Sequence, residues 1–249
     1  MPLNDKQQER YARHLTLKEI GVEGQERLLE SKVIVVGAGG LGSPAAFYLA
    51  AAGIGTIGLM DGDTVDRSNL QRQILHTTEA IGEKKVNSAE TRLRALDPAI
   101  KLNLYPFRLT LENAQDILAL YDFVIDATDN FESKFLIAKA CHLASKPYSH
   151  AGIKQFYGQT ITVHPGKTAC YHCVFHEGGI PAATTPSGPI GALPGVIGSM
   201  QAIEAIKFLL SIGTPLTNTL LTYDALSTEI RKVPVTKDPH CPLCSTHNA

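Results

Sequence analysis

The pattern of apolar and polar positions predicts strands that alternate with helices. Residues 32–36, 56–60 and 123–127 are short, mainly apolar runs, typical of strands that are buried on both faces of a parallel sheet. The segments between and beside these runs favour helix, because their apolar residues recur at helical spacing or their composition is rich in alanine. Helices are predicted at 44–52, 82–96, 112–120 and 131–145, and further strands at 100–105 and 147–151.

The pattern changes from residue 158 onward. Residues 159–164 alternate polar and apolar, which indicates antiparallel structure, and 219–223 with 228–235 read as a closing hairpin. A helix is predicted at 196–210. The intervening segment 174–194 is rich in glycine, proline, alanine and threonine, and is predicted to be a long mobile loop. The fold class is therefore α/β: a Rossmann-like, mostly parallel sheet with helices on both faces, extended by C-terminal antiparallel strands.

A glycine-rich turn follows the first predicted strand. It contains Gly37, Gly39, Gly40 and Gly42, and it leads into the helix at 44–52. Glycines let the backbone turn sharply and approach a phosphate, and a helix N-terminus offers free N–H groups to an anion. The next strand ends at Asp61, whose carboxylate suits ribose hydroxyls. Together these features predict a nucleotide site.

Polar residues follow other predicted strands at the edge where ligands bind in such sheets. The irregular segment 62–73 carries Asn69 and Arg72, and arginine makes forked contacts with phosphate oxygens. Asp129 follows the strand at 123–127 and offers an oxygen ligand for Mg²⁺. Lys84 and Lys85 lie in a predicted helical first turn, where cations are disfavoured, which suggests that a lysine there serves an anionic ligand. A solvated loop remains an alternative for 62–73, and Asp126 is expected to cap a loop or the following helix.

Composition excludes several classes of function. The chain has 249 residues and a formal net charge of −1, which argues against a broad nucleic-acid or membrane surface. The polar residues 1–10 do not resemble a signal peptide, and glycine and proline interrupt the uncharged stretches, so no membrane span is predicted. We expect a cytoplasmic protein.

Four of the five cysteines form two C-x-x-C pairs. Two such pairs can complete a tetrahedral set of thiolates that suits structural Zn²⁺. The pairs are Cys170 with Cys173 and Cys241 with Cys244, and the sequence alone does not show that they meet. Redox-active or unrelated pairs are the alternative, and His172 and His240 adjoin the pairs as possible substitute ligands. The fifth cysteine, Cys141, is expected to be a small buried apolar residue.

Taken together, these motifs resemble the ThiF/MoeB/HesA family, the bacterial relatives of ubiquitin-activating enzymes. The resemblance covers residues 5 to 245 and rests on the glycine turn, Asp61 and Asp63, the Asn69–Gln73 segment, Lys85, the 126–130 segment and the paired cysteines. It implies a homodimer that binds ATP and Mg²⁺ and adenylates the C-terminal carboxylate of a ubiquitin-fold sulfur carrier ending in Gly-Gly.

The resemblance also implies roles for individual residues. Arg72 and Lys85 correspond to residues that hold the triphosphate, Asp129 to a Mg²⁺ ligand, and Arg13 to an arginine supplied by the other subunit. Without the resemblance, Arg13 would be interpreted as a solvated surface residue. The implied nucleotide contacts are Gly37, Gly39, Gly40, Gly42, Asp61, Asp63, Asn69, Arg72, Gln73, Lys85, Asp129 and Asn130. The chain is thus expected to be one adenylation domain, with a helical arm (1–31), a nucleotide-binding half (32–157) and a carrier-binding half with the zinc knuckle (158–249).

One departure from the family concerns a cysteine. Many members carry one in the loop that follows the first C-x-x-C pair, where this chain has Thr184 and Thr185 and no cysteine between 174 and 240. A hydroxyl is a poor substitute for a thiolate, so no covalent carrier–enzyme intermediate is expected and an external sulfur donor is implied.

Several other functions stay open at this stage. The sequence does not choose between molybdopterin and thiamine biosynthesis. An NAD(P)-dependent oxidoreductase is an alternative, because the glycine turn and Asp61 also suit NAD. Two further alternatives are a non-catalytic partner of the carrier and adenylation of a carboxylate on a small molecule or tRNA.

Overall fold

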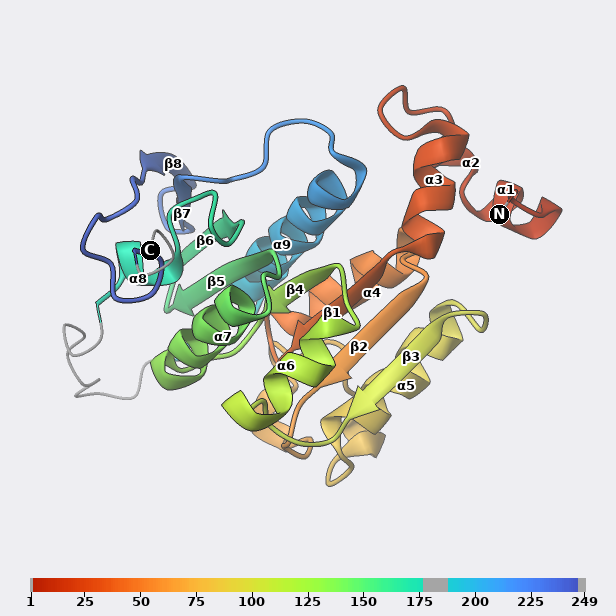
Figure 1. Ribbon diagram of the computed structural model, residues 1–249. Helices are drawn as coiled ribbons and strands as arrows, with labels where there is room; N and C mark the ends of the chain where they lie inside the picture. Colours follow the sequence, from red (N-terminus) through yellow and green to blue (C-terminus); the bar gives the residue numbers. More distant parts are fainter. Residues whose placement is uncertain (1, 177–187, 246–249) are drawn as a thin grey trace.

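The computed structural model describes residues 2–176 and 188–245, and it forms one eight-stranded sheet (Figure 1). The strand order is β3-β2-β1-β4-β5-β6-β7-β8; the first five strands in this order are parallel, and the pairs from β5 to β8 are antiparallel. The predicted fold class is confirmed. The strands are β1 (Lys32–Val36), β2 (Thr56–Met60), β3 (Lys101–Tyr105), β4 (Phe123–Asp126), β5 (Tyr148–Lys154), β6 (Tyr157–Val163), β7 (Thr219–Asp224) and β8 (Glu229–Pro234).

Helices cover both faces of the sheet and divide the core into two apolar layers. One layer packs β1 and β2 against α4, α5 and α9; the other packs the opposite face against α6 and α7 (Figure 1). The helices are α1 (Asp5–Arg10), α2 (Ala12–Leu15), α3 (Gly21–Glu30), α4 (Gly42–Ala51), α5 (Lys85–Leu96), α6 (Leu111–Ala119), α7 (Phe131–Leu143), α8 (Tyr171–Val174) and α9 (Ala192–Leu210), with 3-10 turns η1 (Arg67–Asn69) and η2 (Thr78–Ala80).

The first part of the predicted helical arm consists of α1 and α2, two short helices that meet at Tyr11. Two predicted helix boundaries were wrong. The helix predicted from residue 82 starts at Lys85, because Gly82 has a positive φ of 91° and Lys84 pairs with Thr64 in an isolated bridge. α9 starts at Ala192, four residues early, with Pro194 in its first turn, where the missing N–H is harmless. The predicted mobile loop therefore ends before Ala192, and its residues 177–187 lie outside the described part of the chain.

The N-terminal arm docks at the opposite end of α4 from the glycine turn. Gln25 is buried; its Nε2 donates to Ala52 O at 2.9 Å, and its Oε1 lies 2.8 Å from His14 Nδ1. A Cβ on Gly53 would lie 2.7 Å from the Tyr11 hydroxyl, so the arm contacts the chain directly after α4. The ten residues of α4 span about 15 Å and separate the arm from the turn.

α9 is the one helix of the described residues that is long and apolar enough to cross a membrane. Its buried residues include Leu193, Ile197, Ala202 and Ala205, which belong to the apolar layer shared with α4. We therefore interpret α9 as a core helix and not as a membrane span.

Candidate functional site

The glycine turn lies where β1 and β4 end side by side, the point at which the strand order reverses. Gly37 N donates to Met60 O and Ala127 N to Val36 O. Gly37 has a φ of 101°, and a Cβ there would lie 2.7 Å from Ala127 O. A Cβ on Gly42 would lie 1.8 Å from Gly37 O. Both positions therefore require glycine for the turn itself, and the turn forms the crevice in which such sheets bind ligands.

Asp61 ties this turn to the end of β2. Its Oδ2 accepts from Ala38 N and its Oδ1 from Asp63 N, each at 2.9 Å. The Ala38 carbonyl accepts in turn from His76 Nε2 at 2.8 Å. Burial lowers the pKa of His76, so the ring is neutral and its Nδ1 accepts from the Ser88 hydroxyl. Asp61 thus fixes the backbone of the predicted nucleotide turn. This structural role does not depend on which ligand the turn binds.

A pocket of about 470 Å³ opens beside the turn. It brings together six of the residues predicted from sequence, which come from the segment after β2, the start of α5 and the end of β4. The lining residues are Gly62, Asp63, Thr64, Asp66, Asn69, Arg72, Gln73, Lys85 and Asp129. The predicted glycines are not in this lining, but Gly39 and Gly40 are adjacent, since Cβ atoms there would lie 3.6 Å from Gln73 Nε2 and 3.4 Å from Arg72 Cγ.

The pocket holds two cations in different environments. Lys85 is only 6% exposed, and its Nζ lies 3.2 Å from Asp63 Oδ2 and 3.7 Å from Asp61 Oδ2. Arg72 is half-buried and donates from Nη1 to Ser68 O at 3.1 Å, which leaves most of its guanidinium donors for a ligand. Gln73 contributes a buried Oε1 that has no hydrogen-bond partner among the described residues.

Asp129 and Asn130 take different positions although they are neighbours. Asp129 lines the pocket, and its carboxylate accepts only a long hydrogen bond, 3.4 Å, from Asn130 Nδ2 in the described structure. Asn130 caps α7, with its Oδ1 accepting from Ser133 N at 2.8 Å, and is not in the pocket lining. Both residues are predicted nucleotide contacts; Asn130 also caps α7, and its contact with a nucleotide stays a prediction.

Arg108 is a charged residue at this site that sequence analysis did not select. It follows the end of β3, and its Nη2 donates to Asp63 Oδ1 at 3.1 Å. Partial burial acts to raise the pKa of Asp63, but the hydrogen bonds from Arg108 and Lys85 outweigh it and lower the pKa. Arg108 could have been selected from the sequence, because it follows the carboxyl end of a predicted strand.

A buried polar cluster behind the Asp129 loop was also missed. Asp126 Oδ2 accepts from His150 Nδ1 at 2.8 Å and lies 3.5 Å from Lys134 Nζ. Burial acts to raise the pKa of Asp126, but Lys134 and His150 hold it at about 2. Burial, with the nearby Lys134 charge, lowers the pKa of His150 to about 4, so this ring is neutral. As expected, Asp126 also caps the loop, because Oδ1 accepts from Thr128 N.

Arg13 does not reach the pocket of its own chain. It is exposed on α2, in the arm that docks beyond the far end of α4. An Arg13 that contacts a nucleotide in this pocket must therefore come from another copy of the chain.

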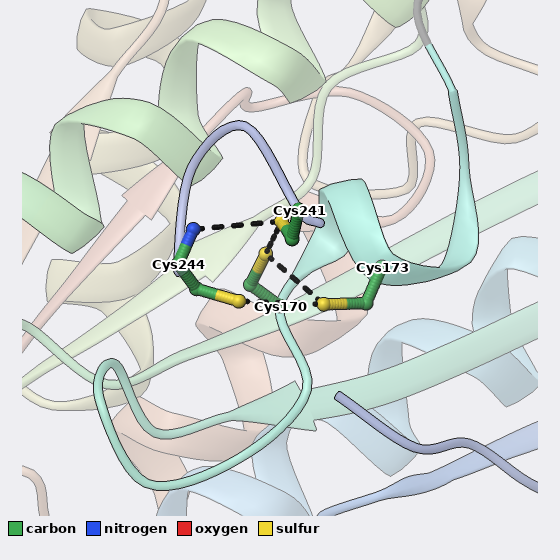
Figure 2. A group of neighbouring side chains, drawn as sticks. All are labelled: Cys170, Cys173, Cys241 and Cys244. Atoms are coloured by element: carbon green, nitrogen blue, oxygen red, sulfur yellow. Dashed lines mark hydrogen bonds between the residues drawn. The ribbon is translucent and has the colours of Figure 1, made fainter. Parts of the chain in front are cut away.

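The two C-x-x-C pairs meet, although residues 174–240 separate them (Figure 2). All four sulfur atoms lie within 4.8 Å of one another, with Sγ–Sγ distances of 3.7 Å for Cys170–Cys173, 3.5 Å for Cys170–Cys241 and 3.4 Å for Cys173–Cys244. A tetrahedron with Zn–S bonds of about 2.3 Å has sulfur separations of about 3.8 Å. The donor set and its spacing are those of a closed structural zinc site.

Backbone groups around the cluster favour thiolates. Cys244 N lies 3.4 Å from Cys241 Sγ, and Asp238 N lies 3.5 Å from Cys173 Sγ (Figure 2 draws the first). With no metal bound, burial and the neighbouring Cys173 raise the pKa of Cys170. A bound divalent cation reverses this effect, since a coordinating thiol is deprotonated outright.

Comparisons with known proteins agree with this arrangement. The chain is 46% identical over 245 residues to a sulfur carrier protein adenylyltransferase from Thermus thermophilus, covering 95% of this chain and 90% of that protein. It is 42% identical over 248 residues to the SAMP-activating enzyme E1 of Haloferax volcanii, covering 98% and 91%. It also matches the adenylyltransferase and sulfurtransferase MOCS3 of Arabidopsis thaliana at 41% identity, where it spans 53% of that longer protein.

Solved structures share the fold. Escherichia coli MccB bound to MccA-N7isoASN superposes with a TM-score of 0.85 at 23% identity, covering 97% of this chain and 75% of MccB. At this identity the likeness establishes the architecture alone. The ThiF family pattern matches residues 11–243, nearly the whole chain, and with relatives at 46% identity the conclusion is that the chain belongs to the ThiF family.

Proposed function

We propose that this protein is an ATP-dependent adenylyltransferase that activates the C-terminal glycine carboxylate of a ubiquitin-like sulfur-carrier protein. One observation carries the proposal: Arg72, Lys85 and Asp129, from three separate segments, line one pocket beside the glycine turn. The name of the 46% identical Thermus relative, of which the chain covers 90%, supports the same activity.

The proposed chemistry needs positioning and charge more than proton transfer. The carrier carboxylate attacks the α-phosphorus of ATP; a C–O–P bond forms, the bond from the α-phosphorus to the bridging oxygen breaks, and pyrophosphate leaves. A carboxylate is already a nucleophile at neutral pH, so no general base is required. Lys85 and Arg72 neutralise the phosphate oxygens as charge shifts to the leaving group.

The charge balance of the pocket supports a divalent cation. Among the described residues, three lining carboxylates, Asp63, Asp66 and Asp129, face two lining cations, and Arg108 beside the lining bonds Asp63. The side chains are thus close to charge balance, and a polyphosphate would bring an excess of negative charge. Asp129 has no ion pair in the described structure and offers the hard oxygen ligand that Mg²⁺ requires. Bound there, Mg²⁺ would neutralise and orient the phosphates.

The position of the arm supports a homodimer. Because Arg13 lies beyond the far end of α4 from its own pocket, the role that the family resemblance implies for it requires a second copy of the chain. We propose that each subunit supplies Arg13 to the other's site.

The C-terminal half is proposed to receive the carrier. Residues 158–249 contain the antiparallel strands and the cysteine cluster, which we propose holds Zn²⁺ as a structural ion. The segment with Thr184 and Thr185 lies outside the described residues; since it lacks a cysteine, we propose that the acyl-adenylate passes to an external sulfur donor in the cytoplasm. Molybdopterin and thiamine biosynthesis are the proposed pathways.

Pyrophosphate exchange into ATP tests the proposal. The purified protein is assayed with Mg²⁺ and a panel of Gly-Gly-ended carriers of the molybdopterin and thiamine types, each paired with a version that lacks the last glycine. We expect exchange with one intact carrier and none with its truncated control, which identifies substrate and pathway together. ATP binding without exchange for any carrier would overturn the carrier as substrate.

A further inference from the structure

The loop that carries Asp129 is anchored from behind by a buried charge. Lys134 lies in the first turn of α7 and is 6% exposed. Its Nζ donates to Thr128 O and to Ala151 O, each at 2.6 Å, and lies 3.5 Å from Asp126 Oδ2. Three acceptors require three N–H donors, so the geometry is that of a protonated ammonium with every donor used.

Asp126 also holds Thr128, the residue whose carbonyl accepts from Lys134. Its Oδ1 accepts from Thr128 N at 3.1 Å and from Thr128 Oγ1 at 2.6 Å. Every backbone and side-chain polar atom of Thr128 is therefore bonded to either Asp126 or Lys134. Thr128 directly precedes Asp129.

Asp129 itself lacks such anchors. It is exposed, and only the long hydrogen bond from Asn130 reaches its carboxylate in the described structure. Asn130 is fixed as the cap of α7. The placement of the Asp129 carboxylate in the pocket thus depends on the backbone between Thr128 and Asn130.

A buried ion pair requires a reason, because it stabilises a fold little better than apolar residues of the same size. Here the pair connects three segments: β4 through Asp126, α7 through Lys134, and β5 through the Ala151 carbonyl and His150. The ring of His150 packs on Tyr171 at 4.5 Å between centroids, which backs the cluster from the cysteine side.

We propose that Lys134 is a positioning residue: by holding the Thr128 carbonyl, it places the Asp129 carboxylate to bind the magnesium ion of Mg·ATP. The inference rests on the proposed function, since it assumes that Asp129 binds this ion. Lys134 is not among the residues that line the pocket, and we infer that it acts through the backbone of the loop.

The experiment compares ATP affinity in Mg²⁺ with ATP affinity in EDTA, by calorimetry on the full chain without a carrier. We call the affinity in Mg²⁺ divided by the affinity in EDTA the magnesium gain. For Lys134→Met we expect the gain to fall at least tenfold, while the affinity in EDTA stays within twofold of wild type. Lys146→Met is the matched control, because Lys146 Nζ also donates to two backbone carbonyls, Ala119 O and Tyr121 O, away from the pocket. It should keep the full gain.

A second variant separates positioning from stability. Lys134→Met leaves Asp126 buried without its cation, which destabilises the fold, whereas the double variant Lys134→Met/Asp126→Asn removes both charges and keeps an acceptor for Thr128. We expect the double variant to fold and to retain the lowered gain. A double variant with the wild-type gain would overturn the inference. A wild-type protein with no gain would instead overturn the magnesium role of Asp129, and this inference would fall with it.

Discussion

Lys85 Nζ lies 3.2 Å from Asp63 Oδ2, so the buried cation of the pocket is paired with a carboxylate that lines the same pocket. Asp63 is half exposed and also bonds Arg108, whereas Lys85 is almost fully buried. A triphosphate that enters the pocket therefore meets a cation that is already oriented and partly desolvated. Such preorganised charge stabilises a transition state more than a mobile surface lysine does.

Replacing Lys85 tests this arrangement. Lys85→Met should lower carrier-dependent pyrophosphate exchange by about 10²- to 10³-fold, because the charge that develops on the phosphates loses its fixed partner. The neighbouring Lys84 is exposed, and within the described part of the chain its Nζ donates to Gly62 O alone, so Lys84→Met is the control and should stay within a few-fold of wild type. Equal losses in both variants would show that Lys85 has no special role.

Asp129 should be required for turnover and not for folding. Asp129→Asn keeps the size of the side chain but weakens a ligand for Mg²⁺, and we expect exchange to fall about 10²-fold or more. The thermal unfolding midpoint should not change measurably, because the carboxylate is exposed and accepts one long hydrogen bond from the described residues. Asp116→Asn, on the exposed side of α6, is the control. Unchanged exchange in Asp129→Asn would exclude the magnesium role.

Residues that belong to a recognisable local motif could be predicted, including Arg72, Lys85 and Asp129, which lie in separate segments and meet in the folded pocket. The glycine turn and Asp61 belong to one strand–turn–helix–strand unit, so their spacing carried the information. Arg108, Lys134 and His150 could not be found in this way, because their partners lie in other elements: Arg108 on Asp63 after β2, and the other two on Asp126 at the end of β4. Only the folded sheet brings them together.

The cysteines, too, could be predicted only in part from the sequence. Each C-x-x-C pair is visible in the sequence, but their meeting depends on the path of the chain through β6, α9 and the β7–β8 hairpin. One boundary failed for a local reason, since Gly82 with its positive φ delays α5. Apolar periodicity does not report such local backbone details.

His150 should make stability depend on pH. Its pKa is about 4 in the folded protein and about 6.5 when unfolded, so between these values the unfolded chain binds a proton that the folded chain does not. Stability is therefore fully present above pH 6.5 and is lost as the pH falls toward 4, by about 3 kcal/mol in total. The free energy of unfolding in urea at several pH values measures this.

His150→Asn is the variant that isolates the effect, because an asparagine amide can still donate to Asp126. We expect its stability curve to be flatter between pH 4 and 6.5, with a residual slope from His76, whose pKa burial also lowers. Exposed His240 provides the control, and His240→Asn should keep the full slope. An unchanged slope in His150→Asn would mean that the ring is not held neutral by its surroundings.

Zinc removal should destabilise the fold at the C-terminal end. Because metal binding is coupled to folding, we expect one zinc ion per chain and a fall in the melting temperature of roughly 10 °C on chelation. Cys241→Ser should lose the ion. Cys141→Ser is the matched control, since Cys141 is also fully buried but lies outside the cluster, and it should retain zinc. Metal-free protein with an unchanged melting temperature would contradict a structural zinc site.

Alanine substitutions at two glycines with positive φ distinguish the cost of a strained backbone from the cost of a steric clash. Gly37 (φ 101°) would place a Cβ 2.7 Å from Ala127 O, whereas a Cβ on Gly82 (φ 91°) would have no heavy atom of the described residues within 4 Å, apart from its chain neighbours. Gly82→Ala should therefore cost about 1 kcal/mol of unfolding free energy, from the left-handed backbone alone. Gly37→Ala should cost about 3 kcal/mol or more and should also abolish ATP binding, because β1 and β4 must separate to admit the methyl group. Urea unfolding and ATP calorimetry on the two variants measure both effects. Similar losses at the two positions would mean that the close approach of Gly37 to Ala127 does not hold the crevice in shape.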